Sequence, residues 1–423
     1  MRKAIVLFAL LVPVGASADA FHGNVALLGA RASGLGGAAA GLPEDDAAPF
    51  YNPACIALDP WLQVSFSAQA LQLQQRSYSP YLGSKATETA AALVPNASSG
   101  SFPWRGGRAS FSAFTTDDES LTLNQTFSPN ADTGVKLAHI RRLESDVTYQ
   151  LGPSYGRPIN DILSVGLSVL YVYRTSSARA DEDFTASQAN ANPIAVTHTL
   201  DSDSVSQGLA FVGGVRLQPA GPQGRFTFGL TLRSGVSLSA QVANHEQRFL
   251  GTAVPNCTPD PAVTSSCVVY TAVPVNTPAQ TSSGLPAAAM GGASMRIGPG
   301  LVSAQVTLTS AFTDDSGGVP AKLTVDGAVG GEMPIDNGWS ARAGVYSRRS
   351  SVPDASVAPR IDQYGATLGV GKVDPHHVTD VAVVLVRDSG AAPVASVTGG
   401  TTQANVSGYT LMITLGGAFR FSE

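Results

Sequence analysis

The side chains of this sequence that could bind a metal do not stand in a known metal-binding spacing. The six histidines are scattered along the chain, at His22, His139, His198, His245, His376 and His377. None of them forms an H-E-x-x-H motif or a cysteine–histidine zinc spacing. The pair His376-His377 follows Asp374-Pro375, so we interpret it as a solvated turn and not as a metal site. The sequence therefore predicts no metal, no cofactor and no enzyme. A catalytic triad assembled from distant strands stays an alternative, because its members need not be adjacent in sequence.

Glycines are concentrated near the start of the chain, where they invite comparison with a phosphate-binding loop. Gly34, Gly36, Gly37 and Gly41 stand among alanines. A nucleotide-binding loop would continue with Gly-Lys-Ser/Thr inside a strand-to-helix unit, and this sequence does not. We interpret the glycines as small residues that let a compact segment pack closely inside a narrow space.

The cysteines predict one disulfide. Cys257 and Cys267 lie in a single loop that is rich in proline and threonine. In an oxidising compartment these two thiols are expected to pair, which would stabilise the fold by roughly 2–3 kcal/mol. Two free thiols are the alternative. Cys55 is left over, and we interpret it as a small apolar residue.

The N-terminus has the layout of a secretory signal peptide. Arg2 and Lys3 precede an apolar stretch from Ala4 to Val14, and a small-residue cleavage site follows at Ala18 or Ala20. About eleven apolar residues are too few to span the membrane as a helix, which argues against an anchor. We therefore expect 1–20 to be removed and the mature chain to be exported.

The composition of the exported chain is unusual for a soluble protein. In the full sequence of 423 residues, only 13% are charged, yet 43% are hydrophobic and the net charge is −5. This composition excludes a long disordered chain, and the acidic balance gives no basic surface for nucleic acid. A β-barrel in a membrane explains both the export and the low charge.

The hydrophobic pattern has a period of two from Trp61 onward. Leu62, Val64 and Phe66 alternate with Gln63 and Ser65, as expected when successive side chains point to opposite faces of a strand. The same alternation recurs in 163–173, 302–309 and 409–421. An apolar outer face and a polar inner face are typical of membrane barrels.

The connections alternate between short and long, which predicts fourteen antiparallel strands. The short connections are expected at 116–119, 157–161, 219–224, 298–300, 334–338 and 374–377. The long ones are expected near 73–106, 128–145, 175–204, 243–285, 312–320, 350–360 and 388–406. A soluble β-sandwich is the alternative, but it would not sort its loops by length in this way.

Several segments resemble the FadL-like outer-membrane transporters of long-chain fatty acids and other hydrophobic compounds. The resembling segments are 29–38, 43–48, Asn52-Pro53-Ala54, 149–173, 230–239, 340–346, Pro353-Asp354 and 364–369. The resemblance implies a 14-stranded antiparallel barrel over 59–423, with residues 21–58 as a plug or hatch inside its lumen. It also implies diffusive passage of a hydrophobic small molecule, a fatty acid or a hydrocarbon. The residues expected to bind substrate or to gate its passage are Phe21, Leu28, Phe50, Asn52, Pro53 and Ala54.

The end of the chain, Thr414–Phe421, resembles the assembly signal of bacterial barrels, and an ordinary amphipathic strand is the alternative.

The predicted protein is a monomer integral to the bacterial outer membrane. Its expected partners are lipid and lipopolysaccharide, the barrel assembly machinery and the hydrophobic ligand. The rival functions are a non-transporting barrel whose loops bind surfaces, and a general porin. Few strand positions are charged on this reading, with Arg233 and Arg342 facing inward, which disfavours a porin.

Overall fold

The computed structural model describes residues 27–42, 46–58, 61–128, 135–186, 194–221, 224–253, 268–276, 279–312, 320–356, 358–395 and 401–421. The predicted signal peptide at 1–20, Phe21 and the predicted Cys257–Cys267 disulfide lie outside these residues.

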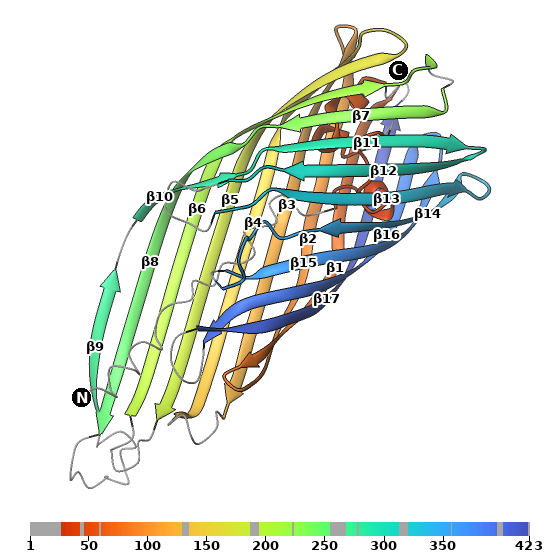
Figure 1. The fold of residues 1–423 in the computed structure, drawn as a ribbon. Coiled ribbons are helices and arrows are strands. Elements are labelled where there is room, and N and C mark those ends of the chain that lie inside the picture. The colour runs from red at the N-terminus through yellow and green to blue at the C-terminus, as the bar shows by residue number, and fades with distance from the viewer. Residues whose placement is uncertain are drawn as a thin grey trace.

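The described strands form one antiparallel sheet that closes on itself (Figure 1). Their bounds are β1 (Leu62–Tyr81), β2 (Ser84–Trp104), β3 (Gly107–Phe127), β4 (Val135–Pro158), β5 (Leu163–Ala186), β6 (Ile194–Leu217), β7 (Phe226–Arg233), β8 (Val236–Ala253), β9 (Val268–Asn276), β10 (Ala279–Leu285), β11 (Ala288–Ile297), β12 (Gly300–Thr309), β13 (Thr324–Pro334), β14 (Trp339–Arg348), β15 (Arg360–Val373), β16 (His377–Ala395) and β17 (Thr401–Phe421).

The strand pairing confirms the predicted fourteen-stranded barrel. β7 and β8 both pair with β6, so they are two parts of one interrupted strand. β9 and β10 pair with β8 while β11 pairs with β7, so these three are parts of the next strand. The last strand, β17, pairs with β1, with Phe421 opposite Leu62, and this pairing closes the ring.

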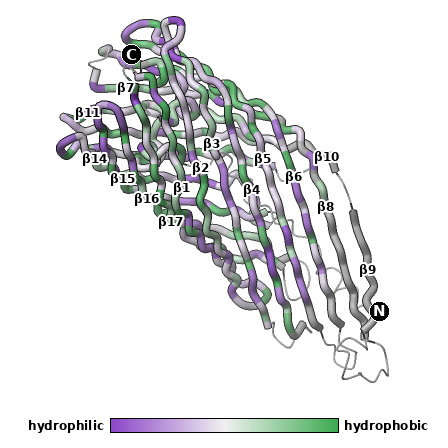
Figure 2. Tube along the Cα trace, turned by 180° about the vertical axis from the view of Figure 1, so that it is seen from behind, coloured by the Kyte–Doolittle hydropathy of each residue, from purple (hydrophilic) through white to green (hydrophobic). Residues whose placement is uncertain are grey.

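Side chains alternate across the wall as the sequence predicts. On β1, the side chains of Leu62, Val64 and Phe66 are exposed on the outer face, whereas Gln63 and Ser65 are buried. Figure 2 shows hydrophobic and hydrophilic residues interleaved along the strands. The outer face is thus apolar, and the inner face presents many glutamine, serine and threonine side chains.

The turns sort to the two ends of the barrel, but several predicted positions are wrong. Residues 116–119 are not a turn, because they lie inside β3, and 73–106 is not a long loop, because it contains the end of β1 and all of β2. β1 and β2 are instead joined by Leu82-Gly83, both with positive φ. The short connections after β2, β4, β6, β11, β13 and β15 lie at one end of the barrel, here called the short-turn end, together with the C-terminus, whereas Leu82-Gly83 lies at the other end (Figure 1). The other end is called the long-loop end.

The strands also extend farther than predicted toward the long-loop end. β5 continues to Ala186 and β6 starts at Ile194, although 175–204 is predicted as a loop. These parts of the strands are rich in aspartate, serine and threonine, which are typical of loops, although apolar residues such as Ala178, Ala180 and Leu200 still alternate with the polar ones.

The residues before the barrel form short helices. They are α2 (Ala30–Gly34), α3 (Ala48–Tyr51) and the 3-10 helix η1 (Pro53–Leu58). None of the described helices is long and apolar enough to cross a membrane. We call the described part of 27–58 the N-terminal segment.

Candidate functional site

The N-terminal segment is hydrogen-bonded to the inner wall on many sides of the barrel. Ser168 of β5 donates to Pro49 O at 2.7 Å, and Thr231 of β7 donates to Tyr51 O at 2.7 Å. On other strands, Ser294, Ser303 and Thr367 donate to carbonyl oxygens of Gly41, Ala38 and Gly34. Asn96 of β2 bonds both Gly29 N and Leu27 O. These contacts place the segment against the inner wall.

Asn52 is fully buried and fastens the segment both to itself and to the barrel. Its Nδ2 donates to Ala40 O at 2.8 Å and to Val215 O of β6 at 3.0 Å. Its Oδ1 accepts a hydrogen bond from Ala54 N at 3.1 Å. Asn52 has an extended backbone that ends α3, and Pro53 then begins η1. The Asn-Pro-Ala element therefore lies directly on the wall.

Glycines in the wall, as well as those in the segment, allow this close contact. A Cβ on Gly166, Gly214 or Gly229 would collide with Pro53, Asn52 or Ala40, respectively. Hence even an alanine at these wall positions would push the segment away from β5, β6 or β7.

Phe50 and Leu28 lie in one packed apolar cluster with inward side chains such as Leu170 and Val212. The Phe50 ring packs edge-on against Phe114, with centroids 5.6 Å apart, and the Arg233 guanidinium lies 3.9 Å from the Phe50 centroid. Arg233 faces inward as predicted and donates to Gln150 Oε1 at 2.8 Å. Of the predicted site residues, Leu28 and Phe50 thus share one cluster, while Asn52, Pro53 and Ala54 meet the wall.

A chain of ion pairs links the segment to the wall at the short-turn end. Arg31 Nε donates to Glu332 Oε2 at 3.0 Å. Arg342 donates to the same Glu332 oxygen at 2.6 Å and also to Asp380. Arg342 therefore faces inward, as predicted. The same residues border a cavity at this end, next to Trp339 and Arg420.

The prediction of few charged strand positions is wrong, because the inner wall carries further ion pairs toward the long-loop end. Arg76 Nη1 lies 2.8 Å from Glu119 Oε1, and Arg76 Nη2 lies 3.3 Å from Asp388 Oδ2. Other pairs are Arg174–Asp146 and Arg142–Glu182, with His198 3.5 Å from Glu182. Most of these side chains lie in segments that the sequence assigns to turns or loops.

The hydrogen-bond ladder between β2 and β3 is interrupted. The two strands pair at Thr89 and Thr122, and again from Ala97 and Phe114 to their turn. Residues 90–96 and 115–121 are all described, yet no β2–β3 pair joins them. β3 stays paired with β4 through this stretch, with a register shift between Thr115 and Asp117. The shift is a bulge that bends β3 away from β2.

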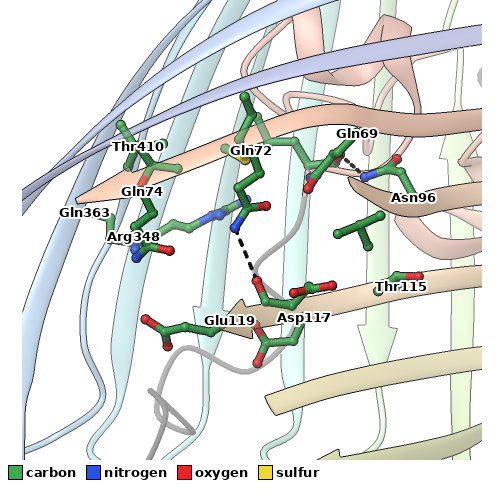
Figure 3. A pocket seen from close by; sticks show the side chains of 15 residues that line it. Gln69, Gln72, Gln74, Asn96, Thr115, Asp117, Glu119, Arg348, Gln363 and Thr410 are labelled. Atoms are coloured by element: carbon green, nitrogen blue, oxygen red, sulfur yellow. Dashed lines mark hydrogen bonds between the residues drawn. The ribbon is translucent and has the colours of Figure 1, made fainter. Parts of the chain in front are cut away.

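A cavity lies inside the barrel at this interruption (Figure 3). Its lining is mostly polar and comes from both sides of the break: Leu27, Gln69, Gln72, Gln74, Val94, Asn96, Thr115, Asp117, Asp118, Glu119, Arg348, Gln363, Val386, Thr410 and Met412. Gln72 Nε2 of β1 reaches Asp118 O of β3 at 3.5 Å, so it spans the position of β2. Of the described N-terminal segment, Leu27 lines this cavity.

An apolar cluster lies on the inner face beyond the ion pairs, at the long-loop end. Tyr81 and Phe127 stack with their ring centroids 5.1 Å apart. Buried with them are Tyr78, Leu82, Ala86, Leu123, Ala138, Ile140, Ile361, Ala392, Val394, Ala404 and Val406. From the long-loop end inward, the lumen thus presents an apolar cluster, a layer of ion pairs, the cavity at the break and the N-terminal segment.

One sequence pattern associated with serine nucleophiles is structural here. Gly152-Pro153-Ser154-Tyr155-Gly156 has the spacing Gly-x-Ser-x-Gly, which in some hydrolases forms a turn between a strand and a helix. In this barrel Ser154 lies within β4 and donates to Ser168 Oγ at 2.7 Å, which itself bonds Pro49 O. Ser154 therefore supports the packing of the segment.

Sequence reasoning missed the break and the cavity beside it. Residues 116–119 are polar and are predicted as a turn, although they lie in a bulged strand beside the cavity. The polar Gln69, Gln72 and Gln74, which alternate with apolar residues, gave the available signal for a polar inner wall.

No family model and no curated protein matches this sequence. Solved structures do match its fold. A Pseudomonas aeruginosa FadL homologue superimposes with a TM-score of 0.62 at 15% identity, covering 94% of this chain and 99% of that one. The Ralstonia pickettii toluene transporter TbuX gives a TM-score of 0.59 at 13% identity, covering 95% and 100%. The CymD monoaromatic hydrocarbon channel gives 0.59 at 12% identity, covering 94% and 99%. The fold is therefore that of these channels and transporters, as the sequence resemblance implies.

Proposed function

We propose that this chain is a channel of the bacterial outer membrane for diffusive uptake of hydrophobic small molecules, such as fatty acids or hydrocarbons. The observation that carries the proposal is the interrupted β2–β3 ladder with a cavity on its inner side. A hydrophobic solute gains little from an aqueous pore, whereas an opening in the wall leads it to the apolar interior of the membrane. The named activities of the structurally similar channels agree with this proposal.

The path begins at the apolar cluster of the long-loop end and leaves through the wall at the break. The cluster offers stacked aromatic rings and buried aliphatic side chains to an apolar solute. Beyond the break, Leu93 of β2 exposes 74% of its surface on the outer face. In this proposal residues 21–58 act as the plug, which keeps polar solutes from crossing.

The test is to tie β2 to β3 across the break. A cysteine pair replacing Ala91 and Ser120 is joined by a bis-methanethiosulfonate, which forms a reducible disulfide with each thiol, and uptake of radiolabelled toluene is measured in cells. We expect the linked protein to lose most of its uptake and to regain it on reduction. A matched pair replacing Phe102 and Ala109, which already face each other in the intact ladder, should leave uptake unchanged.

The possible outcomes separate the parts of the proposal. If linked and unlinked proteins take up toluene equally, the route does not pass through the break. If no toluene uptake depends on the protein, the channel function is wrong. A non-transporting barrel with surface-binding loops would give that second result, whereas a general porin would admit polar solutes instead.

The predicted gate at Asn52-Pro53-Ala54 is a second part of the proposal. We infer that Phe21, Leu28 and Phe50 contribute to binding on the segment and that Asn52 holds it shut. The three hydrogen bonds of the Asn52 side chain support this role, since a single residue joins Ala40, Ala54 and the wall.

The setting of the channel follows from the same proposal. The apolar outer face would contact membrane lipid, and lipopolysaccharide would surround the long-loop end. The signal peptide at 1–20 would direct the chain to the periplasm and would then be removed. The barrel assembly machinery would recognise Thr414–Phe421. The closed ring needs no second copy, so a monomer is proposed.

A further inference from the structure

The cavity at the β2–β3 break has two unlike walls. One wall is apolar and is formed by Leu27, Val386 and Met412, with Tyr346 packed behind them. The other wall is the bulge of β3, which brings Asp117, Asp118 and Glu119 to the cavity (Figure 3). A ligand in this cavity can bury apolar surface on one side, but it meets carboxylates on the other.

Among the described residues, the arginines near these carboxylates are fewer than the carboxyl groups around them. Among the described residues that line the cavity, Arg348 is the one cation. Arg76 lies beside Glu119 but also bonds Asp388, and Arg174 interacts with Asp117 but also bonds Asp146, so each of these two arginines is shared between two carboxylates. Glu88, directly opposite Arg76 on β2, adds a further carboxyl group. The fixed charge around the cavity is therefore negative.

A negative fixed charge around a cavity disfavours the binding of anions much more than the binding of neutral ligands. Inside a protein the effective dielectric constant is far below that of water, so like charges repel over several ångströms. A neutral apolar molecule does not feel this repulsion and keeps the whole gain of burial on the apolar wall.

We propose that the acidic bulge of β3 makes this channel selective for uncharged hydrophobic compounds over carboxylates of the same chain length. This inference rests on the proposed function and narrows it, because it favours hydrocarbons and alcohols over fatty-acid anions. Asp117, Asp118 and Glu119 are then specificity-determining residues.

The experiment compares two ligands that differ only in their head group. Uptake of radiolabelled 1-dodecanol and dodecanoate is measured at pH 7.5 in cells that depend on this protein for uptake. We expect the alcohol to enter about tenfold faster than the carboxylate. The variant Asp117→Asn/Asp118→Asn and the single variant Asp118→Asn should raise the ratio of dodecanoate uptake to dodecanol uptake several-fold.

A matched control removes one carboxylate elsewhere. Asp161→Asn lies in the short turn between β4 and β5, away from the cavity, and should change neither rate. The amount of heat-modifiable barrel in the membrane corrects every rate for assembly. Equal uptake of the two ligands by the wild type, or an equal rise of both in the variants, overturns the selectivity. Dodecanol that does not enter at all overturns the channel function and the selectivity with it.

Discussion

Arg76 and Asp388 form an ion pair that crosses a complete strand. Arg76 lies on β1 and Asp388 on β16, and Gly408 of β17 is the residue opposite both. A Cβ on Gly408 would lie 3.0 Å from Asp388 Oδ2, so the absence of a side chain opens the path between the charges. Arg342 likewise bonds Asp380 across β15, where a Cβ on Gly371 would collide with both side chains, although Gly371 is opposite Asp380 alone.

Gly408→Ala should therefore destabilise the barrel. The added Cβ would lie 2.7 Å from Gln75 O and would also press on the buried Asp388. We expect a loss of about 2 kcal/mol in the free energy of unfolding, measured by urea titration of the protein in lipid vesicles. Gly291→Ala is the control, because its Cβ would meet nothing within 4 Å. Equal stability of the two variants would contradict the argument.

Glu332 should matter more than Arg31 for holding the N-terminal segment. Glu332→Gln weakens the pairs with both Arg31 and Arg342, whereas Arg31→Gln leaves the Arg342 pairs with Glu332 and Asp380 in place. We expect amide exchange of 27–42 to become faster in both variants. The free energy of the opening that allows exchange should fall by about 1 kcal/mol in Arg31→Gln and by roughly 3 kcal/mol in Glu332→Gln.

Hydrogen–deuterium exchange with mass spectrometry measures this difference. Lys372→Gln is a suitable control, since its ion pair with Asp374 lies outside the segment at the short-turn end. The ion-pair chain does not hold the segment if 27–42 exchanges at the wild-type rate in both variants.

Asn52→Ala should change transport more than assembly. The substitution removes the side-chain donor shared by Ala40 O and Val215 O, while the outward Leu62, Val64 and Phe66 still meet lipid. We expect toluene uptake to change several-fold in Asn52→Ala and in Pro53→Ala at a nearly constant amount of heat-modifiable barrel. Asn160→Ala, in a short turn, serves as the control. Unchanged uptake in both variants at equal barrel abundance would show that this element is not the gate.

The three cysteines should differ in oxidation state. Mass spectrometry of protein isolated without a reductant should find Cys257 linked to Cys267. Cys55 is a buried thiol in the structure, so it should be recovered as a thiol. Finding Cys257 and Cys267 as thiols in protein isolated this way would remove the predicted stabilisation of their loop.

The architecture could be predicted from sequence because its signal repeats. Outward residues such as Leu62, Val64 and Phe66 must be apolar wherever the barrel faces lipid, which leaves a period of two in many strands. The five short turns at 157–161, 219–224, 298–300, 334–338 and 374–377 were also predicted correctly, because turns need glycine, proline, asparagine or aspartate at particular positions.

The interior could not be predicted from the same signal. Thr115–Ser120 is polar because it faces a polar lumen at a bulge, but a polar run of that length also describes a turn. Likewise, Gly229 and Gly214 give no local sign that they contact the N-terminal segment, since the contact joins residues far apart in the chain. Such pairings depend on register across the ring, which a single sequence does not specify.

The register of Leu62 opposite Phe421 has a consequence for the order of folding. The first strand begins where the last strand ends, so the N-terminal segment is attached to the rim at the seam of the ring. A ring that closed with the segment outside would leave Thr231, Ser303 and Arg233 without the carbonyl groups they bond. We therefore expect ring closure to be favoured when the N-terminal segment already lies against the inner wall, because closure then leaves these donors paired.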